Sequence, residues 1–167
     1  MRAKKNAAES AHKPHGASEQ RIANAEPPKA PVSFLIPGKP QGKARPRFAA
    51  GHAYTDERTK QYEDITALLY RRAAEGQAFP KGTPVSVEIT LCFAPPKSKP
   101  KKTRDAMLAG EILPLVKPDA DNAAKIILDA LNGIAYEDDT QVTVLTVTKA
   151  YAASNFVTVT LKTAERK

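Results

Sequence analysis

Polar and apolar residues alternate in four parts of the chain, and this alternation predicts β-strands there. The first strand is expected in VSFLIPG, at residues 32 to 38, and the second in PVSVEITLCF, at residues 84 to 93. Two further runs near the end of the chain, QVTVLTVTKAY and NFVTVTLKTA, are joined by a short AASN turn. We expect these two runs to pair with each other as a β-hairpin.

Two longer segments have apolar residues near the 3.6-residue period of an α-helix. The first extends from Asp56 to about Ala74, with apolar positions at Tyr62, Ile65, Leu68 and Leu69. The second follows Pro118 and is amphipathic, with apolar positions at Ala123, Ala124, Ile127, Leu128 and Leu131. Asp121 is a candidate for its N-cap, and Asn132 with Gly133 suits a left-handed C-cap.

These elements predict an α+β fold in a single domain. We expect a mixed or antiparallel sheet of about four to five strands, covered by two to three helices, the third being a short one in RDAMLAGE after a basic loop. The 167-residue length suits one compact domain. Residues 1–30 hold few large apolar residues and end in EPPKAP, which predicts a disordered basic tail before a domain at residues 31–167.

The charge balance favours a polyanionic partner such as nucleic acid. The formal net charge is +8 and the pI is about 9.6. Apolar runs are too short to span a bilayer and no apolar segment follows the basic N-terminus, so we expect a cytoplasmic protein with no membrane partner. The single cysteine, Cys92, lies in an apolar run and is expected to be a small buried hydrophobe.

Carboxylates flank the second predicted helix. Asp119 and Asp121 precede it, and Asp138 and Asp139 follow it just before a strand. If that strand runs back across the sheet, these carboxylates converge and suit Mg²⁺, which prefers hard oxygen ligands. Lys125 lies four residues after Asp121, on the same side of the helix, where an ammonium group suits a scissile phosphate.

The spacing also fits a purely structural interpretation. Asp121 would then be a helix cap paired with Lys125 on the surface, while Asp138 and Asp139 would be turn residues. Asp129, eight residues after Asp121, is expected to be structural.

The segment KPDADNAAKIILDALNGIAYEDDTQV resembles the RusA-type crossover junction endodeoxyribonucleases, whose hallmarks are KPD-x-DN, a helical lysine and a later DD-x-QV. The resemblance extends more loosely to IPGKPQGKARPRF and YTDERTKQYE. It implies that Asp119, Asp121 and Asp139 are catalytic metal ligands and that Lys125 is the essential lysine, with Asp138 a less certain neighbour of Asp139. It also implies a homodimer that makes paired, symmetric nicks in four-way DNA junctions with Mg²⁺, or with Mn²⁺ as a substitute.

Basic residues near the motifs are candidate DNA contacts. Lys43, Arg45 and Arg47 are spaced two residues apart, so an extended chain would point them to one face. Lys39 belongs to the same matched segment, and Lys117 adjoins the acidic motif. Contacts of this kind give salt-dependent affinity for phosphates and little base recognition.

Family habit suggests a bacterial or prophage protein of DNA recombination and repair. Two alternatives remain open at this point. A non-catalytic DNA-binding or architectural protein would use its aspartates as caps and turns only. A metal-dependent phosphohydrolase would turn over nucleotides, although the surplus of positive charge disfavours it.

Overall fold

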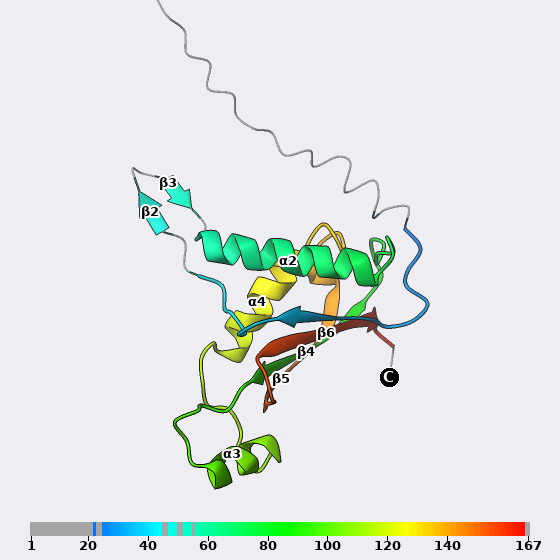
Figure 1. Ribbon diagram of the computed structural model, residues 1–167. Coiled ribbons are helices and arrows are strands. Elements are labelled where there is room, and N and C mark those ends of the chain that lie inside the picture. Colours follow the sequence, from blue (N-terminus) through cyan, green and yellow to red (C-terminus); the bar gives the residue numbers. More distant parts are fainter. Residues whose placement is uncertain (1–21, 23–24, 45–46, 50–51, 55, 166–167) are drawn as a thin grey trace, which may run out of the picture.

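A four-stranded mixed sheet forms the centre of the molecule (Figure 1). The computed structural model describes residues 22, 25–44, 47–49, 52–54 and 56–165. The strand order is β1-β6-β4-β5, in which β4 is parallel to β5 and antiparallel to β6, and β6 is antiparallel to β1. The strands are β1 (Val32–Pro37), β4 (Val85–Phe93), β5 (Val142–Tyr151) and β6 (Phe156–Thr163). This confirms the predicted α+β class and the mixed sheet.

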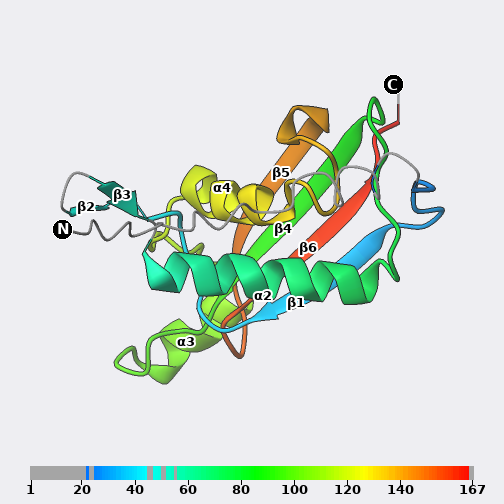
Figure 2. The same ribbon diagram turned by 90° about the horizontal axis from the view of Figure 1, so that it is seen from above.

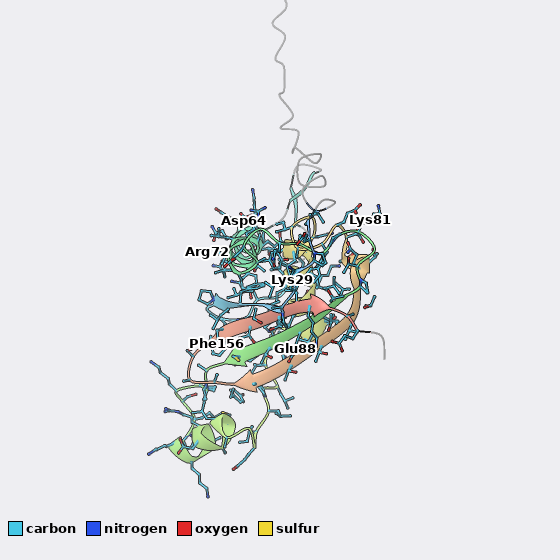
Figure 3. All side chains as sticks on the ribbon, turned by 90° about the vertical axis from the view of Figure 1, so that its right-hand side faces the viewer. Lys29, Asp64, Arg72, Lys81, Glu88 and Phe156 are labelled. Atoms are coloured by element: carbon cyan, nitrogen blue, oxygen red, sulfur yellow. The ribbon has the colours of Figure 1, made fainter. Side chains whose placement is uncertain are left out.

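One face of the sheet carries the core. Alternate residues of a strand point to opposite faces, so the period-two pattern of β4 places five apolar side chains on one side. These are Val85, Val87, Ile89, Leu91 and Phe93, all buried. On the opposite face Glu88 is exposed, and Figure 3 shows both long helices on the other side of the sheet from it. Cys92 is buried, as expected.

Two helices, α2 (Glu57–Ala73) and α4 (Ala120–Leu131), lie side by side over this core (Figure 2). The amphipathic pattern of α4 is confirmed, because its apolar side is fully buried at Ile126, Ile127 and Leu131. Each such side chain contributes about 1.5 to 3 kcal/mol of hydrophobic stabilisation. At the helix end Gly133 has the left-handed backbone that its sequence position predicts, with φ of 70°.

The buried side of α2 differs from the prediction. Ile65 and Leu68 are 46% and 54% exposed, so counting them among the inward positions was wrong. Tyr62 is buried as predicted, and Leu69 packs partly against the core. The other residues of α2 that face the core are Thr59, Thr66, Ala67 and Tyr70. Thr66 can be buried because its hydroxyl donates to the Tyr62 carbonyl oxygen at 2.7 Å, which satisfies the polar group within the helix.

The predicted C-terminal hairpin is wrong. β5 and β6 are consecutive in the sequence, but β4 lies between them in the sheet. The connecting turn instead reaches around the end of β4: the Ala152 amide donates to the Phe93 carbonyl at 2.9 Å, and the Ala94 amide donates to Asn155 Oδ1 at 2.8 Å. β4 has more buried side chains than any other strand of the sheet, which is consistent with its interior position, and β5 lies at the edge beside α4.

Two smaller features complete the fold. Helix α3 (Lys101–Leu108) lies away from α2 and α4, beyond one end of the sheet (Figure 1). It begins at Lys101 rather than at Arg104 as predicted, because Pro100 occupies the N-cap and the lysines after it propagate a helix well. The short strands β2 (Arg47–Ala49) and β3 (His52–Tyr54) form a separate antiparallel pair that the sequence did not predict.

Candidate active site between helix α4 and strand β5

An open hollow of about 590 Å³ lies between α4 and the edge strand β5. Figure 2 shows α4 running alongside β5 over the sheet. The side of α4 that faces away from the core contributes two carboxylates and an ammonium group, and β5 contributes an apolar wall with a third carboxylate just before it. The lining residues are Asp121, Ala124, Lys125, Leu128, Asp129, Asp139, Leu145 and Val147. The structure therefore brings Asp121, Lys125 and Asp139, three of the predicted catalytic residues, to one surface.

The start of α4 determines how its acidic residues are presented. The N-cap is Asp119, not Asp121 as predicted, because the extended backbone of Asp119 ends in a carbonyl that already accepts from the Ala123 amide at 2.9 Å. The carboxylate of Asp119 makes no capping hydrogen bond and is exposed, outside the lining of the hollow. Asp121 lies in the first turn, where the helix dipole favours a negative charge.

Asp121 and Lys125 do not form the surface ion pair that a structural interpretation requires. Within the described part of the chain, neither side chain has an ion-pair or hydrogen-bond partner. Both are exposed at the hollow. Their charges are therefore available to a bound group.

Asp129 is held differently. Its Oδ2 lies 3.0 Å from Lys43 Nζ, and the same ammonium group also pairs with Glu63 on α2. Burial lowers the pKa of Lys43, but the bonds to Glu63 and Asp129 outweigh this and raise it, so the lysine stays charged. The three residues tie the 38–44 segment to both helices at the edge of the hollow.

Adjacent aspartates have different surroundings in the turn before β5. Asp138 precedes the short 3-10 helix η1 (Asp139–Gln141), and its Oδ1 accepts from the Thr140 amide at 2.9 Å. The hydrogen bonds from Thr140 lower the pKa of the Asp138 carboxyl. Asp139 instead lines the hollow, so the geometry favours Asp139 over Asp138 as the residue that faces α4.

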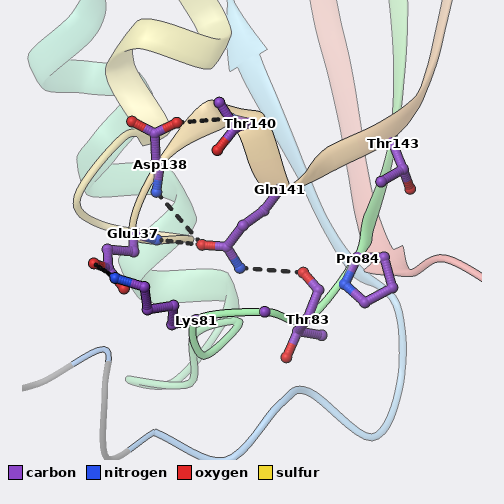
Figure 4. A pocket seen from close by; sticks show the side chains of 9 residues that line it. Lys81, Thr83, Pro84, Glu137, Asp138, Thr140, Gln141 and Thr143 are labelled. Atoms are coloured by element: carbon purple, nitrogen blue, oxygen red, sulfur yellow. Dashed lines mark hydrogen bonds and ion pairs between the residues drawn. The ribbon is translucent and has the colours of Figure 1, made fainter.

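Gln141 holds this turn in place, a role that the sequence analysis missed. Its Oε1 accepts from the Glu137 amide at 2.9 Å, and its Nε2 donates to the Thr83 carbonyl at 3.1 Å (Figure 4). The same Nε2 also donates to the Pro80 carbonyl at 2.8 Å. A side-chain amide offers both a donor and an acceptor, which this double anchorage requires. The glutamine of the DD-x-QV motif is the signal that could have found it.

A second pocket, of about 610 Å³, lies behind the same turn (Figure 4). It is slightly larger than the hollow, but its charged groups already have partners within the protein. Glu137 pairs with Lys81 at 3.0 Å, and Asp138 accepts from Thr140. In the part of the chain that the structure describes, the hollow beside α4 is therefore the better candidate site of the two.

The 38–44 segment rests closely on the start of α4. A Cβ atom at Gly42 would lie 2.5 Å from Asn122 Nδ2 and 3.1 Å from Pro118 Cβ, so only glycine fits without displacement. The Lys43 amide also donates to the Asn122 carbonyl at 3.1 Å. Asn122, the asparagine of KPD-x-DN, thus contacts the basic 38–44 segment next to the acidic motif.

The sequence also places the chain in a protein family. The profile of the family Endodeoxyribonuclease RusA matches residues 37–162. A relative, the uncharacterized protein YqaN of Bacillus subtilis (strain 168), is 31% identical over 137 residues, which cover 78% of this chain and 95% of YqaN. The chain belongs to the RusA family of endodeoxyribonucleases. RusA-family enzymes are crossover junction resolvases, they act on branched DNA, and they depend on a divalent metal.

The carboxylate oxygens in the hollow are of the type that binds a divalent metal such as Mg²⁺. Asp121 and Asp139 present carboxylate oxygens, and Mg²⁺ typically uses one or two protein carboxylates with waters and phosphate oxygens as its other ligands. In the described residues no three His, Cys, Asp or Glu side chains are grouped closely enough to hold a cation by themselves. If a metal binds here, Asp121 and Asp139 would supply only part of its coordination shell, and waters and substrate oxygens would supply the rest.

The predicted DNA contacts have varied surroundings. Lys39 and Lys117 are exposed, whereas Lys43 is 26% exposed and bound to two carboxylates. Arg45 lies outside the described residues, and only the backbone of Arg47 is described, at the start of β2. No helix in the described part of the chain is long and apolar enough to cross a membrane.

Proposed function

We propose that this RusA-family member resolves four-way DNA junctions by paired, symmetric nicks, using Mg²⁺, with Mn²⁺ as a substitute. The observation that carries the proposal is the common surface of Asp121, Lys125 and Asp139 in the hollow between α4 and β5. These residues come from the two segments that bear the family motifs, and their charges suit a metal ion and a phosphate together.

Asp121 and Asp139 are the proposed metal ligands. A magnesium ion held there would activate a water and stabilise charge on the phosphate oxygens. Asp119 is proposed as a third acidic group of the site. It adjoins the hollow through the backbone of the α4 N-cap, and its carboxylate is exposed and makes no cap bond, so it is available to the metal or its waters.

Lys125 is proposed to hold the scissile phosphate. It lies between Asp121 and Asp129 on the side of α4 that faces the hollow, one helical turn from each. Leu145 and Val147 form the apolar wall opposite, and a DNA strand bound against this wall would displace water and so strengthen the attraction between the ammonium group and a phosphate oxygen.

Lys39, Lys43, Arg45, Arg47 and Lys117 are the proposed phosphate contacts outside the reacting group. Lys39 and Lys117 are exposed, and they precede Gly42 and Asp119, which lie beside the start of α4. Lys43 would attract a DNA phosphate while it stays ion-paired with Glu63 and Asp129, which hold its ammonium group in a fixed position at the rim of the hollow.

A homodimer fits this substrate. A four-way junction has two-fold symmetry, so two symmetry-related sites would cut opposing strands together. We further propose that residues 1–30 form a basic tail before the 31–167 domain. The protein would act in DNA recombination and repair in the cytoplasm of a bacterial cell, encoded by the host or a prophage.

The test is cleavage of a labelled four-way junction beside a linear duplex of matched sequence, with Mg²⁺, Mn²⁺ or EDTA. We expect paired nicks in the junction only, none with EDTA, and none with Asp121→Asn, whose junction binding should persist. Tight junction binding without cutting under either metal would contradict the proposal and favour an architectural protein. Preferential turnover of small nucleotides would favour a phosphohydrolase instead.

A further inference from the structure

A small pocket of about 170 Å³ lies between the end of β1 and the first turns of α2. It is separate from the hollow beside α4, with which it shares no lining residue. Its lining combines an apolar floor with several groups that can donate hydrogen bonds. The lining residues are Ile36, Pro37, Gly38, Lys39, Gln41, Arg58, Gln61, Tyr62 and Ile65.

The polar groups of this pocket match an anion. Lys39 and Arg58 are positively charged, Gln41 and Gln61 carry amide NH₂ groups, and none of the nine lining residues is acidic. Arg58 and Lys39 have no ion-pair partner in the described residues. Among the described residues, the one carboxylate bonded to this set is Glu57, whose Oε1 lies 3.5 Å from Gln61 Nε2.

Tyr62 supplies an independent observation. Its side chain is buried, with 6% exposure, and its hydroxyl group finds no acceptor in the described part of the molecule. Burial raises the pKa of Tyr62 to about 12, against a smaller lowering by a hydrogen bond from the Gln41 backbone amide, so the hydroxyl keeps its proton. A buried donor without an acceptor destabilises a fold, and an oxygen-bearing ligand in the pocket would satisfy it.

The position of the pocket connects it to the active site. Gln41 lines the pocket, and the next residue, Gly42, rests against Asn122 and Pro118 at the start of α4. On α2, Tyr62 is followed by Glu63, which binds Lys43 at the edge of the hollow. The 38–44 segment therefore lies between the pocket and the hollow, at the end of the molecule where β1 ends and both helices begin (Figure 2).

We propose that the pocket formed by Lys39, Arg58 and Tyr62 binds a backbone phosphate of the DNA substrate, as a second anchor beyond the 38–44 segment. The inference deepens the proposed function, on which it rests for the identity of the substrate. The volume of the pocket equals that of roughly six waters at about 30 Å³ each, which accommodates one phosphate group. Arg58, Gln61 and Tyr62 become positioning contacts for DNA that the sequence motifs did not single out.

The test is equilibrium binding of a fluorescent four-way junction in EDTA, over a range of NaCl concentrations. Arg58→Gln is compared with Arg72→Gln, an equal loss of charge on an exposed residue at the far end of α2. We expect Arg58→Gln to weaken binding about tenfold and to reduce the slope of log K against log salt by about 0.9, as for one lost phosphate contact. Arg72→Gln should leave both nearly unchanged. Equal effects of the two variants would overturn the proposal, because the pocket would then act only through overall charge.

Tyr62→Phe tests the unpaired hydroxyl. We expect weaker junction binding, by about threefold to tenfold, with a Tm equal to or above that of the parent chain, because the variant removes a polar group that is unsatisfied without DNA. A lower Tm with unchanged Kd would show that the hydroxyl has only a structural role and would overturn its assignment.

The same measurements on a linear duplex separate this inference from the proposed function. If the protein neither cuts junctions nor prefers them, the proposed function fails. The difference between Arg58→Gln and Arg72→Gln on the duplex still decides whether the pocket binds a phosphate. If the parent chain, Arg58→Gln and Arg72→Gln all show the same salt slope on the junction and on the duplex, the phosphate-binding role of the pocket is overturned. The proposed function is not affected by that result.

Discussion

Two acidic regions lie on opposite sides of the turn before β5, and they differ in how their charges are satisfied. Behind the turn, Glu137 pairs with Lys81, and Asp138 accepts a hydrogen bond from Thr140. In front of it, Asp139 shares an open hollow with Asp121 and Lys125. Two adjacent aspartates therefore differ in role: Asp138 fixes the backbone of the turn, whereas Asp139 remains available to a ligand.

The contrast between Asp138 and Asp139 predicts very different losses of activity when each is replaced. Asp139→Asn should lower the single-turnover rate of junction cleavage by about a thousandfold or more, because a metal ligand contributes several kcal/mol to the stabilisation of charge in the transition state. Asp138→Asn keeps an oxygen that can accept from Thr140 and should cut within a few fold of the parent chain. Equal losses in both variants would show that the turn acts as one unit.

A smaller effect is expected at Gln141, which holds the turn from behind. Gln141→Ala leaves the Glu137 amide and the Pro80 and Thr83 carbonyls without their partner, which should lower the free energy of unfolding by about 1 to 3 kcal/mol. Urea unfolding measures this loss. If Gln141 also positions Asp139, the variant should need more Mg²⁺ for half-maximal cleavage. Thr143→Ala, in the same pocket but outside this network, is the control and should leave the Mg²⁺ requirement unchanged.

The smallest effect concerns pH. The folded-state pKa of Asp138 is lowered by its bonds to Thr140, so its stabilising effect is present above the unfolded value of about 3.9 and is lost as the pH falls through the lower folded value. Asp138→Asn carries no such charge. The parent chain should therefore lose more stability than the variant between about pH 5 and pH 3. Parallel curves of unfolding free energy against pH would contradict this assignment.

The sequence predicted those parts of the fold that depend on local periodicity. The strand at 85–93 and the buried side of α4 follow directly from the spacing of apolar residues. Strand partners do not, because Asn155 and Ala152 bond to residues at the end of β4 that lie far away in the sequence. Ile65 and Leu68 were placed wrongly because hydrophobicity alone cannot tell that Thr59 and Thr66 occupy the inward positions of α2.

The candidate site was predictable in composition but not in geometry. The motifs named Asp121, Lys125 and Asp139, which line one hollow, and also Asp119, which caps α4 outside the lining. Gln141 and Tyr62 were missed, since the role of each depends on groups from other elements. The spacing of residues along the chain does not show which backbone groups of Pro80 and Thr83 will lie within hydrogen-bond distance of Gln141.

The most direct test of the central claim is to map Mn²⁺ binding on the whole protein by paramagnetic broadening of backbone amide NMR signals, without DNA. The account predicts that substoichiometric Mn²⁺ broadens the signals of Asp121, Lys125 and Asp139 first, before those of Lys81, Gly82 and Thr83 behind the turn. Asp121→Asn combined with Asp139→Asn should abolish this pattern while the rest of the spectrum stays folded. Broadening centred on residues 81–83, or unchanged in the double variant, would contradict the assignment of the metal site to the hollow between α4 and β5.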